Sequence, residues 1–262
     1  MLIGVAGMVG SGKSTLTRAL AARFGLQLAL ESVDDAAPPV EETVSMPSAR
    51  ARAAGVPAVR PAPVGNPWLE LFYGEPGGRE RYGLNLQLHF LATRFASMRQ
   101  MRGLGGSWVL DRTWYEDADV FARGLFEQGL LTPAEYQLYE RLYAELLHSP
   151  AARPPALLVY LHAPLEVIVK RIERRGRQSE RETEHAYWAA LHARYARWIA
   201  AFRACPVLKL DVRDYDLVED PSAIEDVAAR VRERLERRLP QTELWPAVPR
   251  SALTVEAQAS RQ

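Results

Sequence analysis

The sequence contains very little cysteine, since Cys205 is the single one among 262 residues. This excludes an internal disulfide framework, and a buried structural thiol is the role we expect for Cys205. The chain also lacks any apolar run near the roughly 20 residues that a membrane-spanning helix needs. Its first apolar stretch, residues 2–6, is too short for a signal peptide. These absences predict a cytoplasmic protein that does not bind membranes.

A strong net charge is missing as well. The chain has 33 lysines and arginines against 32 acidic residues, which gives a formal net charge of +1. No global field would draw such a protein onto nucleic acid, so any anion site must be local. The composition is 48% hydrophobic and 25% charged, as in ordinary soluble proteins. The length suits one α/β domain with elaborations, or two small domains.

Five short apolar runs are separated by helical patterns, which predicts a parallel sheet that is covered on both faces. The runs are residues 2–6, 27–31, 107–111, 156–161 and 206–211. Two of them end in an acidic residue, Glu31 and Asp111. The carboxyl ends of parallel strands line the ligand crevice of an open sheet, so both acids are candidate site residues.

Helical patterns occupy most of the remaining chain. We expect helices at residues 13–24, 80–101, 116–147 (as a pair), 164–175, 183–202 and 220–239. Thr132 with Pro133 is typical of a helix start, and Gly176 is typical of a helix end. Four aromatic residues recur at helical spacing and favour core packing: Tyr187, Trp188, Tyr195 and Trp198.

Two segments depart from this alternation. Residues 34–65 have no hydrophobic period and hold six of the 18 prolines, which predicts a mobile insertion or an irregular lobe. Residues 240–262 have the composition of a flexible tail. We therefore expect the folded domain to end near residue 239.

The stretch "GMVGSGKST" at residues 7–15 fits the phosphate-binding pattern G-x-x-x-x-G-K-[ST], with a predicted strand before it and a helix after it. The glycines allow backbone N–H groups to turn toward phosphate oxygens at a helix N-terminus. Lys13 is expected to reach the β- and γ-phosphates, and the Ser14 hydroxyl to bind Mg²⁺. The predicted nucleoside triphosphate site comprises Gly7, Gly10, Ser11, Gly12, Lys13, Ser14 and Thr15.

Several protein classes share this loop. A GTPase needs a guanine-reading N-K-x-D, whereas residues 208–211 read "LKLD" and lack the asparagine. A mechanical ATPase usually has a strand that ends in Asp-Glu, whereas Arg112 follows Asp111 here. A small-molecule kinase fits better, because it needs a carboxylate for the acceptor hydroxyl and cations for the transferred phosphoryl group.

The sequence resembles the deoxynucleoside kinase family, which contains deoxycytidine, deoxyguanosine and deoxyadenosine kinases. The resemblance spans most of residues 1–211 and rests on the order of several motifs. Besides the loop they are "ESV" at 31–33, "NPWLELFY" at 66–73, "LNLQLHFLATR" at 84–94, "DRTWYED" at 111–117, "RIERRGRQSE" at 171–180 and "LHARYARWI" at 191–199. It implies a three-layer α/β/α P-loop kinase fold in one domain, residues 1–239. The sheet would have five parallel strands, and residues 166–182 would form an arginine-rich lid.

The resemblance also implies a role for each matching residue. Glu31 would be the general base for the nucleoside 5′-hydroxyl, and Arg112 would bridge the 5′-oxygen and the phosphates. Asp111 would lie beside it, near the water shell of Mg²⁺. Tyr73 and Glu180 would hold the 3′-hydroxyl. The base would contact Gln87, with Arg94 and Asp117 as polar companions and Leu69, Phe72 and Phe121 as apolar walls.

The arginine-rich run supplies the remaining predicted phosphate contacts. Arg171 and Arg175 lie four residues apart and so share one helix face. We expect these two and Arg177 to face the triphosphate, and Arg174 to point outward.

The predicted reaction is phosphorylation of a deoxynucleoside by ATP and Mg²⁺. The Arg94 and Asp117 pair, by resemblance, fits deoxycytidine or a purine deoxynucleoside, and we favour deoxyadenosine or deoxyguanosine. The resemblance further implies a homodimer packed through helices that include residues 84–101. Two alternatives are a nucleoside monophosphate kinase, with Arg79 and Arg81 as the extra cations, and a nucleotide-dependent switch that is not an enzyme.

Overall fold

The computed structural model describes residues 1–29, 66–176, 185–217 and 220–237. Its strands form one parallel sheet in the order β2-β3-β1-β4-β5. They are β1 (Leu2–Gly7), β2 (Gln27–Ala29), β3 (Trp108–Asp111), β4 (Leu157–His162) and β5 (Val207–Asp211). Each predicted apolar run therefore overlaps a strand. In the central register Val5 of β1 pairs with Asp111 of β3, which brings the predicted phosphate loop beside that acid.

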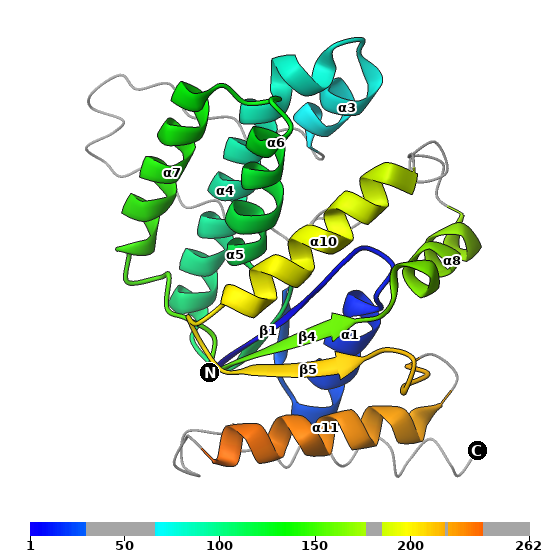
Figure 1. Ribbon diagram of the computed structural model, residues 1–262. Helices are drawn as coiled ribbons and strands as arrows, with labels where there is room; N and C mark the ends of the chain where they lie inside the picture. The colour runs from blue at the N-terminus through cyan, green and yellow to red at the C-terminus, as the bar shows by residue number, and fades with distance from the viewer. Residues whose placement is uncertain (30–65, 177–184, 218–219, 238–262) are drawn as a thin grey trace, which may run out of the picture.

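Helices cover both faces of this sheet, which confirms the predicted three-layer α/β fold. Figure 1 shows α1 and α11 on one face, and α4 to α7 with α10 on the other. The helices are α1 (Lys13–Phe24), α3 (Pro67–Gly74), α4 (Gly78–Leu104), α5 (Trp114–Glu116), α6 (Arg123–Glu127), α7 (Pro133–Leu147), α8 (Leu165–Arg175), α10 (His185–Ala201) and α11 (Pro221–Glu236). A π-helix, η1 (Asp117–Ala122), joins α5 to α6.

The helix boundaries follow the local signals in the sequence. The Thr132 side chain accepts a hydrogen bond from the backbone of Glu135 at 3.3 Å, and Pro133 opens α7. Gly176 ends α8 with φ of 72°, in the left-handed region that favours glycine. Ile168 and Ile172 of α8 are buried one turn apart, so the opposite face of this helix carries its polar side chains.

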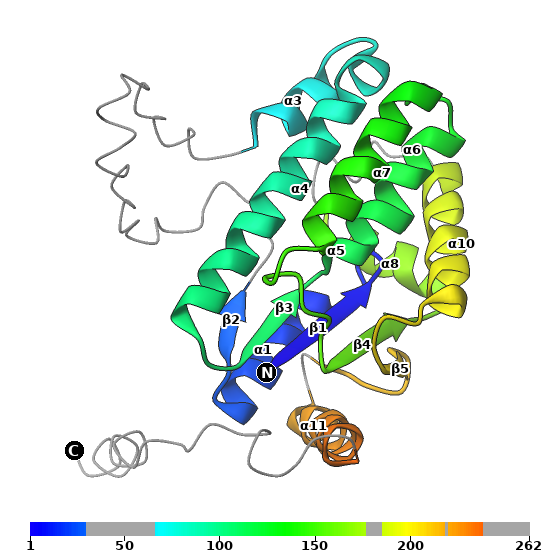
Figure 2. The ribbon, with the colours of Figure 1, turned by 90° about the vertical axis from the view of Figure 1, so that its left-hand side faces the viewer.

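The core is divided in a way that leaves room for a site. The main cluster surrounds the sheet and includes Trp188, Tyr195 and Trp198, as the aromatic spacing predicted. A smaller cluster of Phe72, Leu86, Leu125 and Leu131 joins α3, α4 and α6. Figure 2 shows α3 at the end of α4 that is distant from the sheet. This smaller cluster forms a second wall, across from the carboxyl ends of the strands.

Three further expectations concern the thiol of Cys205, membrane-spanning helices and the two segments without a hydrophobic period. The Cys205 thiol is half-buried, and burial raises its pKa to about 12, which suits an unreactive thiol. No helix in the described ranges is long and apolar enough to cross a membrane. The predicted insertion at 34–65 and the predicted tail at 240–262 lie outside the described residues.

Candidate active site

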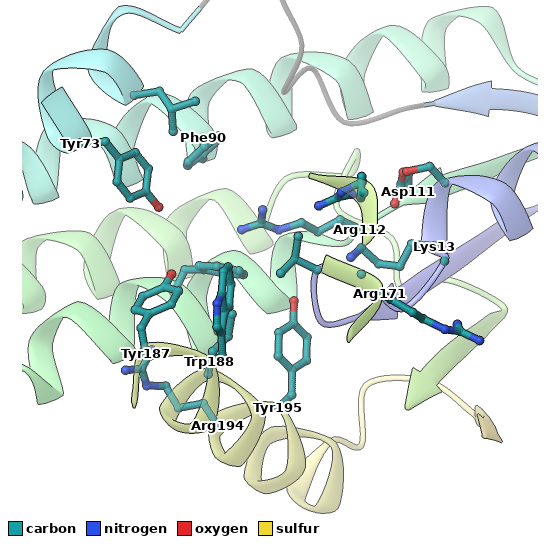
Figure 3. A pocket seen from close by; sticks show the side chains of 18 of the residues that line it. Lys13, Tyr73, Phe90, Asp111, Arg112, Arg171, Tyr187, Trp188, Arg194 and Tyr195 are labelled. Atoms are coloured by element: carbon teal, nitrogen blue, oxygen red, sulfur yellow. The ribbon is translucent and has the colours of Figure 1, made fainter. Parts of the chain in front are cut away.

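One cavity of about 870 Å³ lies at the carboxyl ends of the strands, between the sheet and the smaller cluster (Figure 3). Its size is typical of a small-molecule site. The loop after β1 borders one end, together with α8. Side chains of α3, α4 and α10 border the other end. Arg112 lies between the two ends, as Figure 3 shows.

The loop at residues 7–12 has the backbone geometry that its glycines permit. Gly10 has φ of 80°, and a Cβ atom there would lie 2.8 Å from Cγ1 of Ile172 in α8. Only glycine allows the loop and α8 to approach so closely. Lys13 begins α1 and its Nζ donates to the carbonyl of Met8 at 3.1 Å. The loop residues on the cavity surface are Gly10, Gly12, Lys13, Ser14 and Thr15, whereas Gly7 and Ser11 lie beneath them.

Ser14 and Asp111 bring oxygen atoms together at the sheet edge. The Ser14 hydroxyl donates to Oδ2 of Asp111. The other carboxylate oxygen of Asp111 is buried and has no hydrogen-bond partner among the described residues. A hydroxyl and a carboxylate are ligands that Mg²⁺ takes together with water and phosphate oxygens. The two side chains therefore fit a magnesium site, although no cluster of three or more His, Cys, Asp or Glu residues occurs in the described ranges.

Arg112 has an unusual backbone for a residue other than glycine, with φ of 69°. Such conformations are costly and concentrate at functional sites. Its guanidinium forms an ion pair with Asp117 at 2.9 Å and lies 3.9 Å from the centre of the Phe121 ring. These contacts hold the cation at the middle of the cavity, where it can reach both a phosphate and an acceptor.

Arg94 and Asp117 form an ion pair at 3.0 Å, and the Asp117 side chain is only 1% exposed. Neither residue lies on the cavity surface. The Asp117 carboxylate forms ion pairs with both Arg94 and Arg112. From behind the cavity wall it therefore connects two cations. It begins the π-helix η1, and π-helical turns are frequent at functional sites.

The remaining predicted nucleoside contacts come together at the far end of the cavity. They are Leu69, Phe72, Tyr73, Gln87 and Phe121. Gln87 is 3% exposed, and its side-chain oxygen has no hydrogen-bond partner among the described residues. A buried amide in this condition is suited to a polar ligand, because an unsatisfied buried acceptor is costly.

Tyr73 borders the same end of the cavity, and so does Tyr187 of α10. Desolvation of its hydroxyl at the cavity is the main reason that the pKa of Tyr73 lies above the ordinary value, and Tyr187 adds to the rise, although the residue as a whole is 53% exposed. In Figure 3 the two rings lie on opposite walls. This pair therefore borders the cavity from both α3 and α10.

Basic side chains outnumber acidic ones around the cavity. Among the described residues, Asp111 and Asp216 are the acidic ones. The basic ones are Lys13, Arg18, Arg79, Arg112, Lys170, Arg171, Arg174, Arg175 and Arg194. This excess of basic side chains makes the cavity a local anion site in a chain whose net charge is only +1.

The structure contradicts the prediction for one arginine of α8. Arg171 and Arg175 border the cavity, and Arg171 donates to the carbonyl of Val212 at 2.9 Å. Arg174 borders it too, although we expected it to point outward. Residues three apart on a helix are neighbours as well as residues four apart, so Arg174 shares the face of Arg171. Arg177, Glu31 and Glu180 lie outside the described residues.

Sequence reasoning missed part of the α10 wall. Tyr187, Trp188 and Tyr195 border the cavity, so these aromatics serve the site as well as the core. Arg194 also borders it and packs on α6, where a Cβ atom at Gly124 would lie 2.5 Å from its Nη1. The helical spacing of these residues was visible in the sequence, but spacing alone does not say what faces the helix.

Comparison with known proteins finds relatives over most of the chain. A family model described as deoxynucleoside kinase matches residues 3–236. The chain is 38% identical over 230 residues to a deoxyadenosine/deoxycytidine kinase of Bacillus subtilis (strain 168), which covers 88% of this chain and 91% of that one. It is 28% identical over 241 residues to a deoxyadenosine kinase of Lactobacillus acidophilus, covering 89% and 96%.

Solved structures agree at the level of the fold. A deoxyadenosine kinase from M. mycoides with bound dATP aligns with a TM-score of 0.63 at 20% identity, over 88% of this chain and 99% of that chain. The same enzyme with the products dCMP and dCDP aligns with a TM-score of 0.62, over 89% and 100%. The likeness to these structures concerns the fold and extends over most of the chain.

Proposed function

The chain belongs to the deoxynucleoside kinase family, and from this premise we propose that it transfers the γ-phosphoryl group of ATP to the 5′-hydroxyl of a deoxynucleoside, as a step of nucleotide salvage. One observation carries the proposal. A single cavity has a phosphate-binding loop at one end, an apolar wall with a buried amide at the other, and Arg112 between them.

The donor end fits a triphosphate. Backbone N–H groups of the loop and the Lys13 ammonium would bind the phosphates, and Arg171 and Arg175 would approach from α8 with the neighbouring Arg177. Ser14 and Asp111 would hold Mg²⁺, which supplies charge neutralisation for the phosphates. An arginine near a transferring phosphoryl group can raise the rate by about 10³ to 10⁵.

The acceptor end fits a nucleoside. Gln87 would hydrogen-bond the base, which would pack against Phe72, Phe121 and Leu69. Tyr73 would hold the 3′-hydroxyl with Glu180. Glu31 would accept the proton of the 5′-hydroxyl while Arg112 stabilises charge on the 5′-oxygen and the phosphates.

Arg94 and Asp117 would act indirectly, from behind the cavity wall, because neither borders the cavity. Their ion pair fixes Asp117, and Asp117 in turn fixes Arg112. We propose deoxyadenosine and deoxyguanosine as the favoured acceptors and deoxycytidine as a third. The names of the relatives support this choice, since they include deoxyadenosine, deoxyguanosine and deoxycytidine kinases.

We also propose a cytoplasmic homodimer that packs through α4 and α7. Leu138 and Leu142 lie one turn apart on α7 and are 47% and 39% exposed. Exposed leucines at this spacing form an apolar stripe, which is typical of a helix that packs against another chain. The folded unit that we propose is a single domain over residues 1–239, and the family match to residues 3–236 supports it.

The test is ADP release with ATP and Mg²⁺ against a panel of deoxynucleosides, ribonucleosides and nucleoside monophosphates. We expect purine deoxynucleosides to give the largest stimulation. Stimulation by monophosphates alone would favour a monophosphate kinase, in which Arg79 at the acceptor end would bind the extra phosphate. Nucleotide binding with no stimulation by any acceptor would indicate a switch, and either result would overturn the proposal.

The variant Glu31→Gln tests the proposed general base in the same assay. We expect its turnover to fall by orders of magnitude while ATP binding stays nearly intact, because the base acts on the acceptor and not on the donor. Turnover near that of the wild type would exclude Glu31 as the general base.

A further inference from the structure

Glu116 has no part in the site described so far, yet it lies in the same short segment as Arg112 and Asp117. Its side chain is completely buried. It does not border the cavity, so it cannot contact a substrate there. A carboxylate is costly to bury, and a buried one calls for an explanation in its contacts.

Four hydrogen-bond donors surround this carboxylate. Oε1 accepts from the backbone N–H of Gly7 at 3.3 Å and from the Tyr195 hydroxyl at 3.0 Å. Oε2 accepts from the backbone N–H of Thr113 at 2.8 Å and from its hydroxyl at 3.2 Å. An ionised carboxylate only accepts hydrogen bonds, so it matches a set of four donors that no neutral side chain of this size could satisfy.

The donors belong to three separate segments of the site. Gly7 begins the phosphate loop, Thr113 follows Arg112, and Tyr195 is on the cavity wall formed by α10. Burial raises the pKa of Glu116, whereas the positive charges of Lys13 and Arg112 oppose the rise. The carboxylate therefore lies behind two of the cations on the cavity surface and is electrostatically linked to both.

Hydrogen bonds hold the strained backbone of Arg112 at its own N–H group and at the N–H group of the next residue. Its own N–H donates to the carbonyl of Val5 at 2.9 Å, and the next N–H, of Thr113, donates to Glu116. A residue with φ of 69° keeps that conformation only when its surroundings determine it. The bond from Thr113 to Glu116 is one of those determinants.

We propose that Glu116 is a positioning residue for phosphoryl transfer, which holds the phosphate loop, Arg112 and the α10 wall in one arrangement. The proposal rests on the proposed kinase function. It acts through Gly7, Thr113 and Tyr195 and involves no contact with a substrate. Glutamate is required at this position because the amide of glutamine would turn N–H groups toward N–H and O–H donors.

The experiment compares Glu116→Gln with the wild type. We expect kcat to fall about 10²-fold, because small displacements of catalytic groups can cost that much. The KM of the deoxynucleoside should change little, since Gln87 and Phe72 lie on a different wall. Without any nucleoside, the affinity for ADP measured by calorimetry should fall about tenfold, as for one lost hydrogen bond to a charged group.

Tyr195→Phe provides a second variant that removes only a hydroxyl. We expect kcat to fall about tenfold. In the double variant with Glu116→Ala, kcat per folded molecule should fall no further than in Glu116→Ala alone, because alanine leaves the Tyr195 hydroxyl no carboxylate oxygen to contact. A role confined to folding would instead lower the melting temperature and leave kcat per folded molecule unchanged.

The chain offers a matched control for each change. Glu135 makes the same local contacts with Thr132 on an exposed helix end, so Glu135→Gln should leave kcat within twofold. Tyr139 is as buried as Tyr195, but its hydroxyl has no partner among the described residues, so Tyr139→Phe should also leave kcat unchanged.

The outcomes separate this proposal from the proposed function. If the wild type phosphorylates no deoxynucleoside, the proposed function fails, and the calorimetric comparison still tests Glu116. If the wild type is active and Glu116→Gln equals it in kcat and ADP affinity, the positioning role alone is overturned. Additive losses in the double variant would overturn the link through Tyr195.

Discussion

Two places in this molecule carry the same local pattern, Thr-x-x-Glu at a helix start. In both, the glutamate accepts from the backbone N–H of its own threonine at 2.8 Å and from the threonine hydroxyl. The first pair, Thr113 and Glu116, is completely buried, and the second, Thr132 and Glu135, is at the surface. The same capping box therefore occurs in two different environments, one in the interior and one at the surface.

The surroundings account for the difference. Glu135 has only its own helix start, and hydrogen bonds from Thr132 lower its pKa. Glu116 adds Gly7 and Tyr195, and burial raises its pKa. A motif of four residues thus determines a helix start, whereas burial among donors from other segments gives one copy a role in the site.

The largest expected effect is on stability when each carboxylate is removed. Glu116→Ala should lower the free energy of unfolding by on the order of 3 kcal/mol or more, because it leaves several buried donors without acceptors. Glu135→Ala should cost about 1 kcal/mol, as for an exposed cap. Urea unfolding followed by circular dichroism measures both, and similar losses would contradict the distinction.

A smaller difference is expected when each threonine becomes serine, which keeps the hydroxyl and removes one methyl group. The Thr113 methyl packs on β1, where a Cβ atom at Gly4 would lie 2.8 Å from it. Thr113→Ser should therefore cost about 1 kcal/mol for the lost buried methyl. Thr132→Ser should change stability by less than about 0.5 kcal/mol. The same urea titrations measure both changes in unfolding free energy. A larger loss of stability for Thr132→Ser than for Thr113→Ser would contradict the comparison.

The smallest effect is in the pH dependence, where the two glutamates should differ in sign. The pKa of Glu135 is lowered in the folded state, so its stabilisation is present above the unfolded pKa of about 4.3 and is lost as pH falls. The pKa of Glu116 is raised, so the folded state binds its proton first and gains relative stability as pH falls. As pH falls from 7 to below the unfolded pKa of about 4.3, the loss of unfolding free energy caused by Glu135→Gln should shrink and that caused by Glu116→Gln should grow.

Much of this fold could be predicted because its signals are local. The five apolar runs overlap the five strands of the sheet, and Lys13–Phe24 is a helix with the predicted bounds. The loop at residues 7–15 was evident from glycine spacing, since phosphate binding imposes that spacing on any chain. The cavity residues Gln87, Phe72 and Tyr73 came from a resemblance to a family and not from any local rule.

The missed features depend on contacts between distant segments. Arg174 faces the cavity because α8 packs through Ile168 and Ile172, which sets the rotation of that helix. Arg194 reaches the cavity wall because Gly124 allows a close approach. Asp117 lies behind the wall because two arginines hold it there.

Local chemistry was enough to establish the alternating strands and helices, the phosphate loop and the helix start at Thr132, since each depends on residues only a few positions apart. Tertiary structure alone decided that Glu116, and not Glu135, would meet the loop and α10. Gly7 and Tyr195 are 109 and 79 positions from Glu116. Only the packing of β1 and α10 around the start of α5 brings their donors to one carboxylate.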